Sequence, residues 1–593
     1  MRRAILVLAT LALLAPLAAG CAAAAPAQPA GATPATVESA VSPPTPPEKS
    51  SRPNVVRTAG EVSTLDPALT YDASGIIIQA CYVGLTSLDD VTSATEPGMA
   101  TSWDISEDGT TYTFHLRDGV PWVRWDGEQV VKVQDCDGHD RTVTAYDFQY
   151  GILRALDPET ASAYAYVLDS VVAGAWAYNG GETDDPATVG VRALDEHTLE
   201  VEFLEPVAYD ASIIGLPTAF ATPRWLIEGD DCNEARGERW TDPEYYQSYG
   251  PFALKEWVQD SSLTIVKNPF WPGCDSVPQA KVDEVVWRAL APATAMAEFE
   301  AGNLDFVRVP MDELDRVRAD PELSQLLTIA PTPGTILFVF NTQAPVVDDV
   351  RVRRALSMAI DRRALVEDLL GGGQEPAQWL SRPGTAGAPT LEDYPDLGVK
   401  TDVEAARKLL DEYLQEKGLT ADQLDISLAT MAEPSESLPL EEFVQYQWKS
   451  NLGLDVQVVR LDPQTSVEML LGPEAPQISP IPWVPDYPDS NGFVRDLVAS
   501  GGFVNPADEE GNPAGCMMWR NDEFERLVRE AAREQDPARR VALYAQAEQI
   551  LCYDDAAIIP LYWPTRVTVA QPWLKWTSLF NERYEKWQVL QDE

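Results

Sequence analysis

The sequence predicts an α/β protein, because strand-like and helix-like patterns alternate along the chain. Residues 111–117 (TYTFHLR) alternate apolar and polar side chains with the period of two that marks a half-buried strand. Residues 145–156 keep apolar side chains at helical spacing behind Thr144, a suitable N-cap with an acid three residues later. Residues 336–340 (ILFVF) form an apolar strand that leads into a capped helix. This alternation is typical of α and β elements that pack in layers.

The other elements of the first half follow in chain order. Residues 76–80 (IIIQA) predict a buried helix, and an Asp-Gly turn follows the strand at 111–117. Further strands are expected at residues 198–203, 263–266 and 282–288. Each of these strands precedes loop or helix signals, so the first half mixes α and β structure.

A second α/β region begins near residue 335. The pair Asp348-Asp349 and the single residue Asp361 are expected to cap two successive helices, the second of which ends at the three glycines 371–373. Asp536 followed by Pro537 indicates the start of a late helix, with proline at its first position. The last expected strands span residues 557–562 and 566–570.

Composition limits the class of function. The chain has 593 residues, of which 45% are hydrophobic, which is enough for two or more domains. The formal charge of −49 repels phosphate groups, so we expect no nucleic-acid partner. The same charge is explained by a solubilising surface or by attraction of cationic ligands, and the first explanation is favoured.

The first residues read as an export signal. Arg2 and Arg3 precede an apolar run that ends in LAAGC at Cys21, and we interpret residues 1–20 as a signal peptide. A permanent transmembrane helix is disfavoured because the run is short and contains Pro16. LAAGC resembles a bacterial lipobox, which implies a lipidated Cys21. Residues 21–52 are rich in Ala, Pro, Thr and Ser, which predicts a disordered tether.

Six cysteines remain after Cys21, and an even number in an exported chain suggests disulfides. Proximity in the sequence favours two pairs and leaves a third. The expected pairs are Cys232 with Cys274, Cys516 with Cys552, and Cys81 with Cys136. The chain has no CxxC motif and no Cys/His cluster, so we expect no metal site.

Motifs for catalysis or cofactor binding are also missing from the sequence. It contains no GxSxG, HExxH, P-loop or GxGxxG pattern, and its three histidines have no second histidine at ligand spacing. We expect neither an enzyme nor a cofactor. A hydrolase or peptidase that uses clustered carboxylates remains the less favoured alternative.

Seven blocks, in order, resemble one protein family. They are LDP (65–67), PGMATSW (97–103) with FHLRDGV (114–120), TAYDF (144–148), YGPF (249–252), NT (341–342) with DVRVRRAL (349–356) and AIDR (359–362), DY (486–487) and IPLY (559–562). The chain resembles the extracellular solute-binding proteins of ABC importers, family 5, the peptide- and nickel-binding branch. The stretches SAYAY (162–166) and VGVRALD (189–195) are most similar to oligopeptide-binding proteins.

The resemblance implies a two-lobed, type II periplasmic-binding-protein fold, with an extra α+β domain inserted in lobe I. The expected divisions are 53–75, 191–330 and 556–593 for lobe I, 76–190 for the extra domain, and 331–555 for lobe II. It also implies that ligand is trapped between the lobes and delivered to a membrane permease driven by cytoplasmic ATPases. We expect a monomer held by its lipid anchor on the outer face of the cytoplasmic membrane, periplasmic or extracellular.

The resemblance assigns candidate ligand contacts. An Asp after a Trp-x-x pattern binds the α-amino group of peptides in these relatives, and Asp486 matches it; burial of an ammonium needs such a carboxylate. Trp483 and Tyr487 would line the cleft, Tyr164 would contact ligand at the lobe interface, and Asn341 is a further candidate. The expected ligand is an oligopeptide, and the alternatives within the family are an oligosaccharide, an opine or a metal chelate.

Two departures from the oligopeptide-binding pattern lie beside Trp483. Residues 479–482 (SPIP) contain no basic side chain for a peptide carboxylate, and Val484 stands where the relatives have a cysteine. The motif WVPDYPD (483–489) therefore predicts recognition of a cationic group more directly than recognition of a whole peptide. Of its two acids, Asp486 is the expected ligand anchor, and Asp489 is expected to order the turn.

Overall fold

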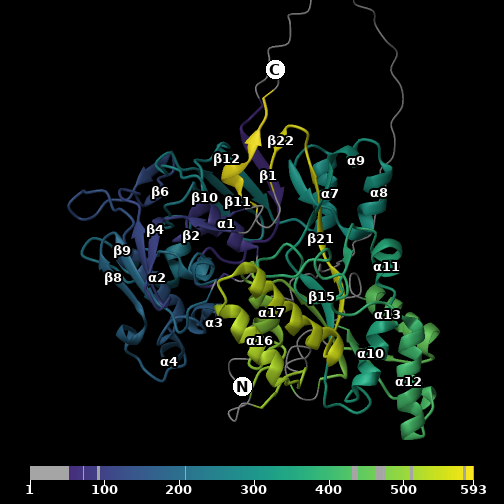
Figure 1. The fold of residues 1–593 in the computed structure, drawn as a ribbon. Coiled ribbons are helices and arrows are strands. Elements are labelled where there is room, and N and C mark those ends of the chain that lie inside the picture. The colour runs from purple at the N-terminus through teal and green to yellow at the C-terminus, as the bar shows by residue number, and fades with distance from the viewer. Residues whose placement is uncertain are drawn as a thin grey trace, which may run out of the picture.

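The computed structural model describes residues 52–70, 73–89, 94–207, 209–430, 438–461, 472, 475–507, 512–577 and 582–591. The predicted signal peptide, tether and lipidation site at Cys21 lie outside these ranges. Within them the chain forms two lobes that differ in their sheets (Figure 1). We call the six-stranded sheet with its helices the second lobe and the other large sheets with theirs the first lobe. No helix in the described ranges combines the length and apolar character that crossing a bilayer demands.

The first lobe is built on a four-stranded sheet of order β1-β12-β11-β10. Its strands are β1 (Val55–Ala59), β10 (Phe252–Val258), β11 (Ser262–Lys267) and β12 (Glu284–Arg288). β1 pairs in parallel with β12, so the start of the described chain is held beside a strand more than 200 positions later. Residues from the C-terminal end, including Tyr584 and Trp587, are buried in the same core.

A second four-stranded sheet, of order β4-β5-β9-β8, packs against helix α2 and shares the first lobe's core. Its elements are β4 (Ala100–Ile105), β5 (Thr111–Leu116), β8 (Val191–Asp195), β9 (Thr198–Glu202) and α2 (Ala145–Leu156). The alternation predicted for β5 is confirmed, because Tyr112, Phe114 and Leu116 are buried. The predicted boundary at residue 190 is wrong, since β9 pairs with β5 and β8 pairs with β9, so both strands continue this sheet.

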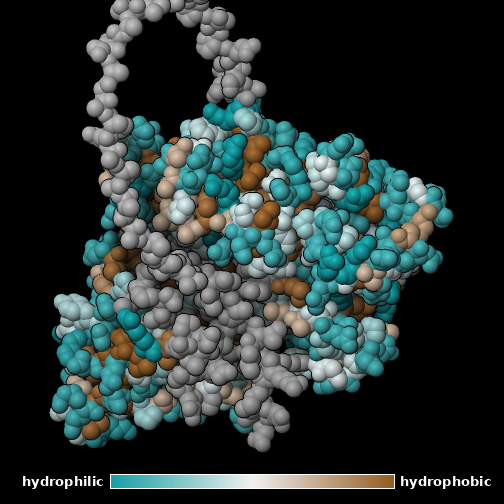
Figure 2. All heavy atoms as spheres, turned by 180° about the vertical axis from the view of Figure 1, so that it is seen from behind, coloured by the Kyte–Doolittle hydropathy of each residue, from teal (hydrophilic) through white to brown (hydrophobic). Residues whose placement is uncertain are grey.

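Small elements complete the first lobe. Its helix α1 (Ser74–Cys81) lies where the sequence predicts a buried helix. The other strands and short helices are β2 (Thr86–Leu88), β3 (Thr95–Pro97), β6 (Val123–Trp125), β7 (Val130–Lys132), α3 (Ala165–Asp169), α4 (Ala175–Asn179), α5 (Asp210–Ile213), α6 (Arg224–Ile227), α7 (Pro292–Glu300), α8 (Leu314–Ala319), α9 (Leu323–Leu326), β22 (Leu574–Lys575) and β23 (Gln588–Val589). Hydrophilic residues cover most of the coloured surface in Figure 2, and hydrophobic ones form separate groups.

The second lobe contains the six-stranded sheet β16-β20-β15-β19-β17-β18. The strands are β15 (Thr335–Phe340), β16 (Glu375–Pro376), β17 (Ser427–Thr430), β18 (Gln457–Arg460), β19 (Ile478–Trp483) and β20 (Ile558–Trp563). The predicted boundary at residue 555 is wrong, because it assigns β20 to the first lobe. β20 pairs with β15 over residues 558–562, which places it inside the second lobe's sheet.

Helices cover both faces of this sheet. One face packs against α10 (Val350–Met358), α12 (Val403–Lys417) and α13 (Leu438–Leu452), and the other against α16 (Asp522–Arg533) and α17 (Pro537–Gln549) (Figure 1). Smaller helices are α11 (Arg362–Ala364) and α15 (Asn491–Phe493). The caps predicted at Asp348-Asp349, Asp361 and Asp536 are confirmed, with Asp349 as the cap of the first pair. Each capping carboxylate accepts a backbone N–H of the helix that follows.

Two adjacent chain segments join the lobes. A three-stranded sheet of order β13-β21-β14 contains β13 (Phe306–Arg308), β14 (Leu327–Pro331) and β21 (Thr565–Ala570). The chain passes from β14 into β15 and returns from β20 into β21. The amide of Thr332 donates to the carbonyl of Pro564 over 3.0 Å, so the two crossings lie side by side. Short paired crossings of this kind act as a hinge between lobes.

The predicted disulfide pairing is wrong. The structure joins Cys136 to Cys232, with their Cα atoms 5.4 Å apart. Both lie on exposed loops that an ion pair between Arg141 and Asp230 draws together. The other four described cysteines are free: Cys81, Cys274, Cys516 and Cys552.

The cysteines that fail to pair are held apart by the packing. Cys81 is buried at the end of α1 in the first lobe's core. Cys516 and Cys552 are both buried in the second lobe, where Cys516 contacts the carbonyl of Val504 and Cys552 contacts the carboxylate of Glu548. Sequence proximity therefore does not place these thiols face to face.

Candidate functional site

Asp486 lies where the second lobe meets the first. Strand β19 ends at Trp483, and the proline-containing turn that follows carries Asp486 to helix α3 of the first lobe. There the hydroxyl of Tyr166 donates a hydrogen bond to a carboxylate oxygen of Asp486. Tyr164 contributes a second hydroxyl and lies next to Tyr166, with 5.6 Å between ring centroids. The structure thus brings Asp486 and Tyr164 together, as the resemblance implies.

The environment of Asp486 leaves its charge poorly compensated. Burial raises the pKa of Asp486 to about 6. The hydroxyls of Tyr166 and Tyr164 act in the opposite direction, and the nearby carboxylate of Asp496 raises the pKa further. Hydroxyl groups solvate a carboxylate but do not neutralise it, and no ion pair within the described ranges involves Asp486. A cation brought by a ligand would supply the missing charge.

Tyr487 forms the second contact between the lobes. Its ring stacks on Tyr209 of the first lobe, with centroids 5.0 Å apart and planes at 23°. Its hydroxyl donates to Asp496 over 2.7 Å and accepts from the side-chain amide of Asn491 over 2.9 Å. Only 2% of Tyr487 is exposed, so this residue belongs to the lobe interface rather than to an open cleft wall.

The acids near Asp486 are matched by cations. Asp496 accepts from the guanidinium of Arg495 over 2.7 Å. Asp489 forms two 2.7 Å bonds with Arg540 and also accepts the amide of Asn491 over 2.8 Å. The predicted turn role of Asp489 is confirmed, and a buried ion pair that the sequence did not indicate is added to it. Asp486 is therefore the acid of the motif that forms no ion pair with another described residue.

The other two candidates have different positions. Trp483 is half-buried, donates to the carbonyl of Gly492 over 2.8 Å, and packs against Phe503. Asn341 follows the opposite end of β15, whose first residue, Thr335, pairs with Trp483. At about 3.4 Å per residue, Asn341 lies about 20 Å along the strand from Trp483. The structure therefore separates Asn341 from the group around Asp486.

Sequence reasoning missed the partners of this group. Tyr166 lies 320 positions from Asp486 and was present in the motif SAYAY without a role assigned to it. The sequence around Tyr209 does not mark it as a site residue, because an aromatic residue near a short helix is common in any core. Both become recognisable only when the two lobes are placed together.

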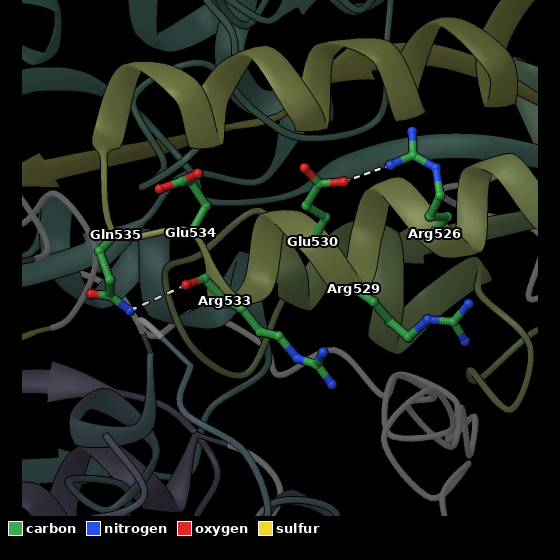
Figure 3. Close-up of a pocket in the computed structure, with 6 residues that line it drawn as sticks. All are labelled: Arg526, Arg529, Glu530, Arg533, Glu534 and Gln535. Atoms are coloured by element: carbon green, nitrogen blue, oxygen red, sulfur yellow. Dashed lines mark hydrogen bonds and ion pairs between the residues drawn. The ribbon is translucent and has the colours of Figure 1, made fainter. Parts of the chain in front are cut away.

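A third lobe contact lies on α16. Arg533 donates to Glu205 of the first lobe, with 3.1 Å between Nε and the carboxylate. Arg533 also borders a surface hollow of about 460 Å³ along α16, where it and Arg529 point to one side and Glu530 and Glu534 to the other (Figure 3). Most charges in the hollow are paired, as Arg526 is with Glu530. Asp486 does not line it, so we do not assign the ligand to this hollow.

Known proteins that resemble this chain over most of its length are bacterial solute-binding proteins. The family model of bacterial extracellular solute-binding proteins, family 5, matches residues 94–505. The oligopeptide-binding protein OppA of Bacillus subtilis is 31% identical over 525 residues, covering 87% of this chain and 88% of that protein. The probable deoxycholate-binding periplasmic protein YgiS of Escherichia coli is 28% identical over 528 residues, covering 87% and 89%. The solved structure of a periplasmic oligopeptide-binding protein (OppAIV) from Borrelia burgdorferi aligns with a TM-score of 0.68 at 26% identity, covering 90% of this chain and all of the other.

Proposed function

Since this chain belongs to the bacterial extracellular solute-binding proteins of family 5, we propose that it captures oligopeptides between its lobes and delivers them to an ABC permease. The observation that carries the proposal is the state of Asp486, a half-buried carboxylate at the lobe contact with hydroxyl partners. The relatives named for oligopeptides support peptide as the ligand class.

A peptide would supply the positive charge that the surroundings of Asp486 lack. Every free peptide carries an α-ammonium group, and a charge-assisted bond to Asp486 would offset the desolvation of both groups. The rest of an extended peptide can be held by main-chain hydrogen bonds and hydrated pockets, which tolerate different side chains. Trp483, Tyr487 and Tyr164 are the proposed neighbours of the peptide's first residues.

Ligand binding is coupled to lobe closure in this proposal. Contacts between described residues of the two lobes include Tyr166 with Asp486, Tyr209 with Tyr487, and Glu205 with Arg533. A ligand that touches both lobes only when they are closed shifts the open–closed equilibrium by its difference in affinity for the two states. The closed form is then recognised by the permease, which two cytoplasmic ATPases drive.

We also propose that the protein is exported and held at the cell membrane by a lipid anchor. Export by residues 1–20 and lipidation of Cys21 would hold a monomer near the outer face of the cytoplasmic membrane, in a periplasmic or extracellular location. Globomycin treatment of cells that express the protein, followed by mass spectrometry of its N-terminus, tests this step. A mature chain without a lipidated Cys21 in untreated cells would contradict it.

The decisive test compares peptides that differ only at the amino group. Peptides of two to six residues should raise the midpoint of thermal unfolding, because ligand that binds the folded state stabilises it. The same peptides with an acetylated N-terminus should raise it much less, since they carry no ammonium. If deoxycholate or an oligosaccharide stabilises the protein and no peptide does, the ligand class is wrong while the family assignment stands.

A further inference from the structure

Glu441 is a second buried carboxylate in the second lobe, and the site described above does not use it. It lies near the start of α13 and is fully buried. Within the described part of the chain, neither of its carboxylate oxygens has a hydrogen-bond partner. A buried carboxylate without a partner is costly, so a group like this is rare unless something else binds it.

Thr430, a polar neighbour of Glu441, also lacks a hydrogen-bond partner for its hydroxyl among the described residues. It is the last residue of β17 and is fully buried. Thr430 lies close enough to Glu441 to act on the pKa of its carboxyl. A carboxylate and a neighbouring hydroxyl with free acceptor sites can both accept hydrogen bonds from an ammonium or guanidinium group.

The topology places this pair at the same sheet edge as Asp486. β17 runs parallel to β19, with Leu428 opposite Ile478, so the carboxyl ends of both strands meet at one edge. β19 leads from that edge to Asp486, and β17 ends there at Thr430. In open α/β sheets, ligands bind outside the carboxyl ends of the strands. Glu441 therefore lies on the ligand side of the second lobe.

Tyr562 of β20 extends this surface across the sheet. It pairs with Ile336, which in turn pairs with Pro482 on β19. Burial raises the pKa of Tyr562, and the charge of Glu441 raises it further, so the two side chains are near each other. Tyr562 and Ile336 are half-buried and Pro482 is exposed, which makes an apolar strip at the edge. The methylene stem of a lysine or arginine packs well on such a strip.

No positive charge faces Glu441 from the described elements that surround it. Burial raises the pKa of Glu441 to about 7, and the charge of Glu442 on the same helix raises it further. Its own backbone N–H and the Thr430 hydroxyl lower the pKa, although neither reaches ordinary hydrogen-bond geometry. Tyr562 is the titratable group that faces it from β20. The carboxyl is therefore poised to lose its proton when a cation arrives.

We propose that Glu441, with Thr430, binds the cationic side chain of a lysine or arginine in the ligand and so makes the protein prefer basic peptides. This inference rests on the proposed capture of peptides. It assigns a second recognition point in addition to the contact between Asp486 and the α-ammonium group. The competing explanation is that Glu441 is neutral and has a purely structural role. In that case a basic ligand would neither bind more tightly nor release a proton from Glu441.

The test uses tetrapeptide series in which one position at a time is lysine or the uncharged isostere norleucine. Isothermal titration calorimetry at pH 7 should show at least tenfold tighter binding for lysine at one position. Titration in two buffers of different ionisation enthalpy should show more proton release with the lysine peptide than with the norleucine peptide. Proton release from Asp486 is common to both peptides and cancels in this comparison.

Glu441→Gln should abolish both the lysine preference and the additional proton release, while the affinity for the norleucine peptide stays within about threefold. Glu412→Gln, which alters an exposed acid of the neighbouring helix α12 and does not act on Glu441, is the matched control and should keep both. Equal binding of lysine and norleucine peptides by the wild-type protein would overturn the inference and leave the capture of peptides intact. Absence of binding by any free peptide would instead overturn the proposed function.

Discussion

The hydroxyl of Tyr166 donates a hydrogen bond to Asp486, joining the first lobe to the second across 320 positions of the sequence. The same carboxylate is the proposed anchor for the ligand's ammonium group. A ligand that binds Asp486, as proposed, would therefore contact a residue that also joins the two lobes.

Replacement of Asp486 by Asn removes the charge but keeps the size of the side chain. We expect the affinity for a free tetrapeptide to fall at least tenfold, about 1.4 kcal/mol, because the ammonium group would be buried without a counter-charge. Calorimetric titration measures this loss. Asp522→Asn, at an exposed acid of α16, is the control and should bind normally. A loss well below tenfold at Asp486 would show that the amino group is anchored elsewhere.

The affinity for peptides should depend on pH through Asp486. Its pKa is raised to about 6, so the carboxyl is largely protonated below that pH and cannot pair with an ammonium group. Affinity should therefore rise as pH increases through about 6 and level off above it. The stability of the unliganded protein changes in the opposite sense, since a raised carboxyl pKa makes this group's contribution fall as pH rises from about 4 to 6.

Removal of the Tyr166 hydroxyl should move this pH dependence. The hydrogen bond from Tyr166 lowers the pKa of Asp486, so Tyr166→Phe should shift the midpoint of the affinity curve to higher pH. Tyr146→Phe changes an exposed tyrosine on α2 and should leave the midpoint in place. An unchanged midpoint in the Tyr166 variant would mean that this hydroxyl does not act on the carboxylate in solution.

The elements that the sequence predicts well are those with local causes. The cap at Thr144 and the alternation in β5 depend on residues a few positions apart, and both are found in the structure. β20 was assigned to the wrong lobe because its apolar sequence suits a strand in either sheet, and only its pairing with β15 decides between them.

The same reason limits prediction of the site. The resemblance places Asp486, but Tyr166 and Tyr209 come to it through the packing of one lobe on the other, which no local pattern encodes. The buried carboxylate of Glu441 also looks like an ordinary helix residue in the sequence, because its environment includes Tyr562 of β20, more than 100 positions away in the chain. Charge balance in three dimensions separates Asp486 from Asp489, although both belong to one seven-residue motif.

The buried ion pair between Asp489 and Arg540 should contribute to the stability of the protein and not to ligand binding. Their side chains are less than a tenth exposed and share two hydrogen bonds. Arg540→Met should destabilise the protein by about 3–5 kcal/mol, because it leaves a buried carboxylate without its partner. Urea unfolding measures the change, and Arg529→Met at an exposed position of α16 should cost far less. Asp489→Asn in the Arg540→Met background should recover part of the loss, since the unpaired charge is then removed.

The pair Glu205 and Arg533 should act on closure while leaving stability nearly unchanged. Both side chains are about half exposed, so the pair contributes only about 0.2–1 kcal/mol. Glu205→Gln should lower the closed fraction of the unliganded protein, measured by energy transfer between dyes on the two lobes, and high salt should have the same effect on the wild type. Arg526→Gln breaks ion pairs confined to α16 and should leave the closed fraction unchanged. If both variants behave alike, the contact between Glu205 and Arg533 does not hold the lobes together.

The disulfide between Cys136 and Cys232 should stabilise the first lobe without affecting the ligand site. It closes a loop of 96 positions, and a cross-link of this size restricts the unfolded chain by about 2–4 kcal/mol. Replacement of both cysteines by serine should lower the unfolding free energy by that amount and leave peptide affinity within about twofold. Alkylation of the native oxidised protein should spare Cys81, Cys516 and Cys552, because all three are buried. A peptide map that links Cys516 to Cys552 would contradict this arrangement, since the structure gives each of those thiols a different neighbour in the second lobe's core.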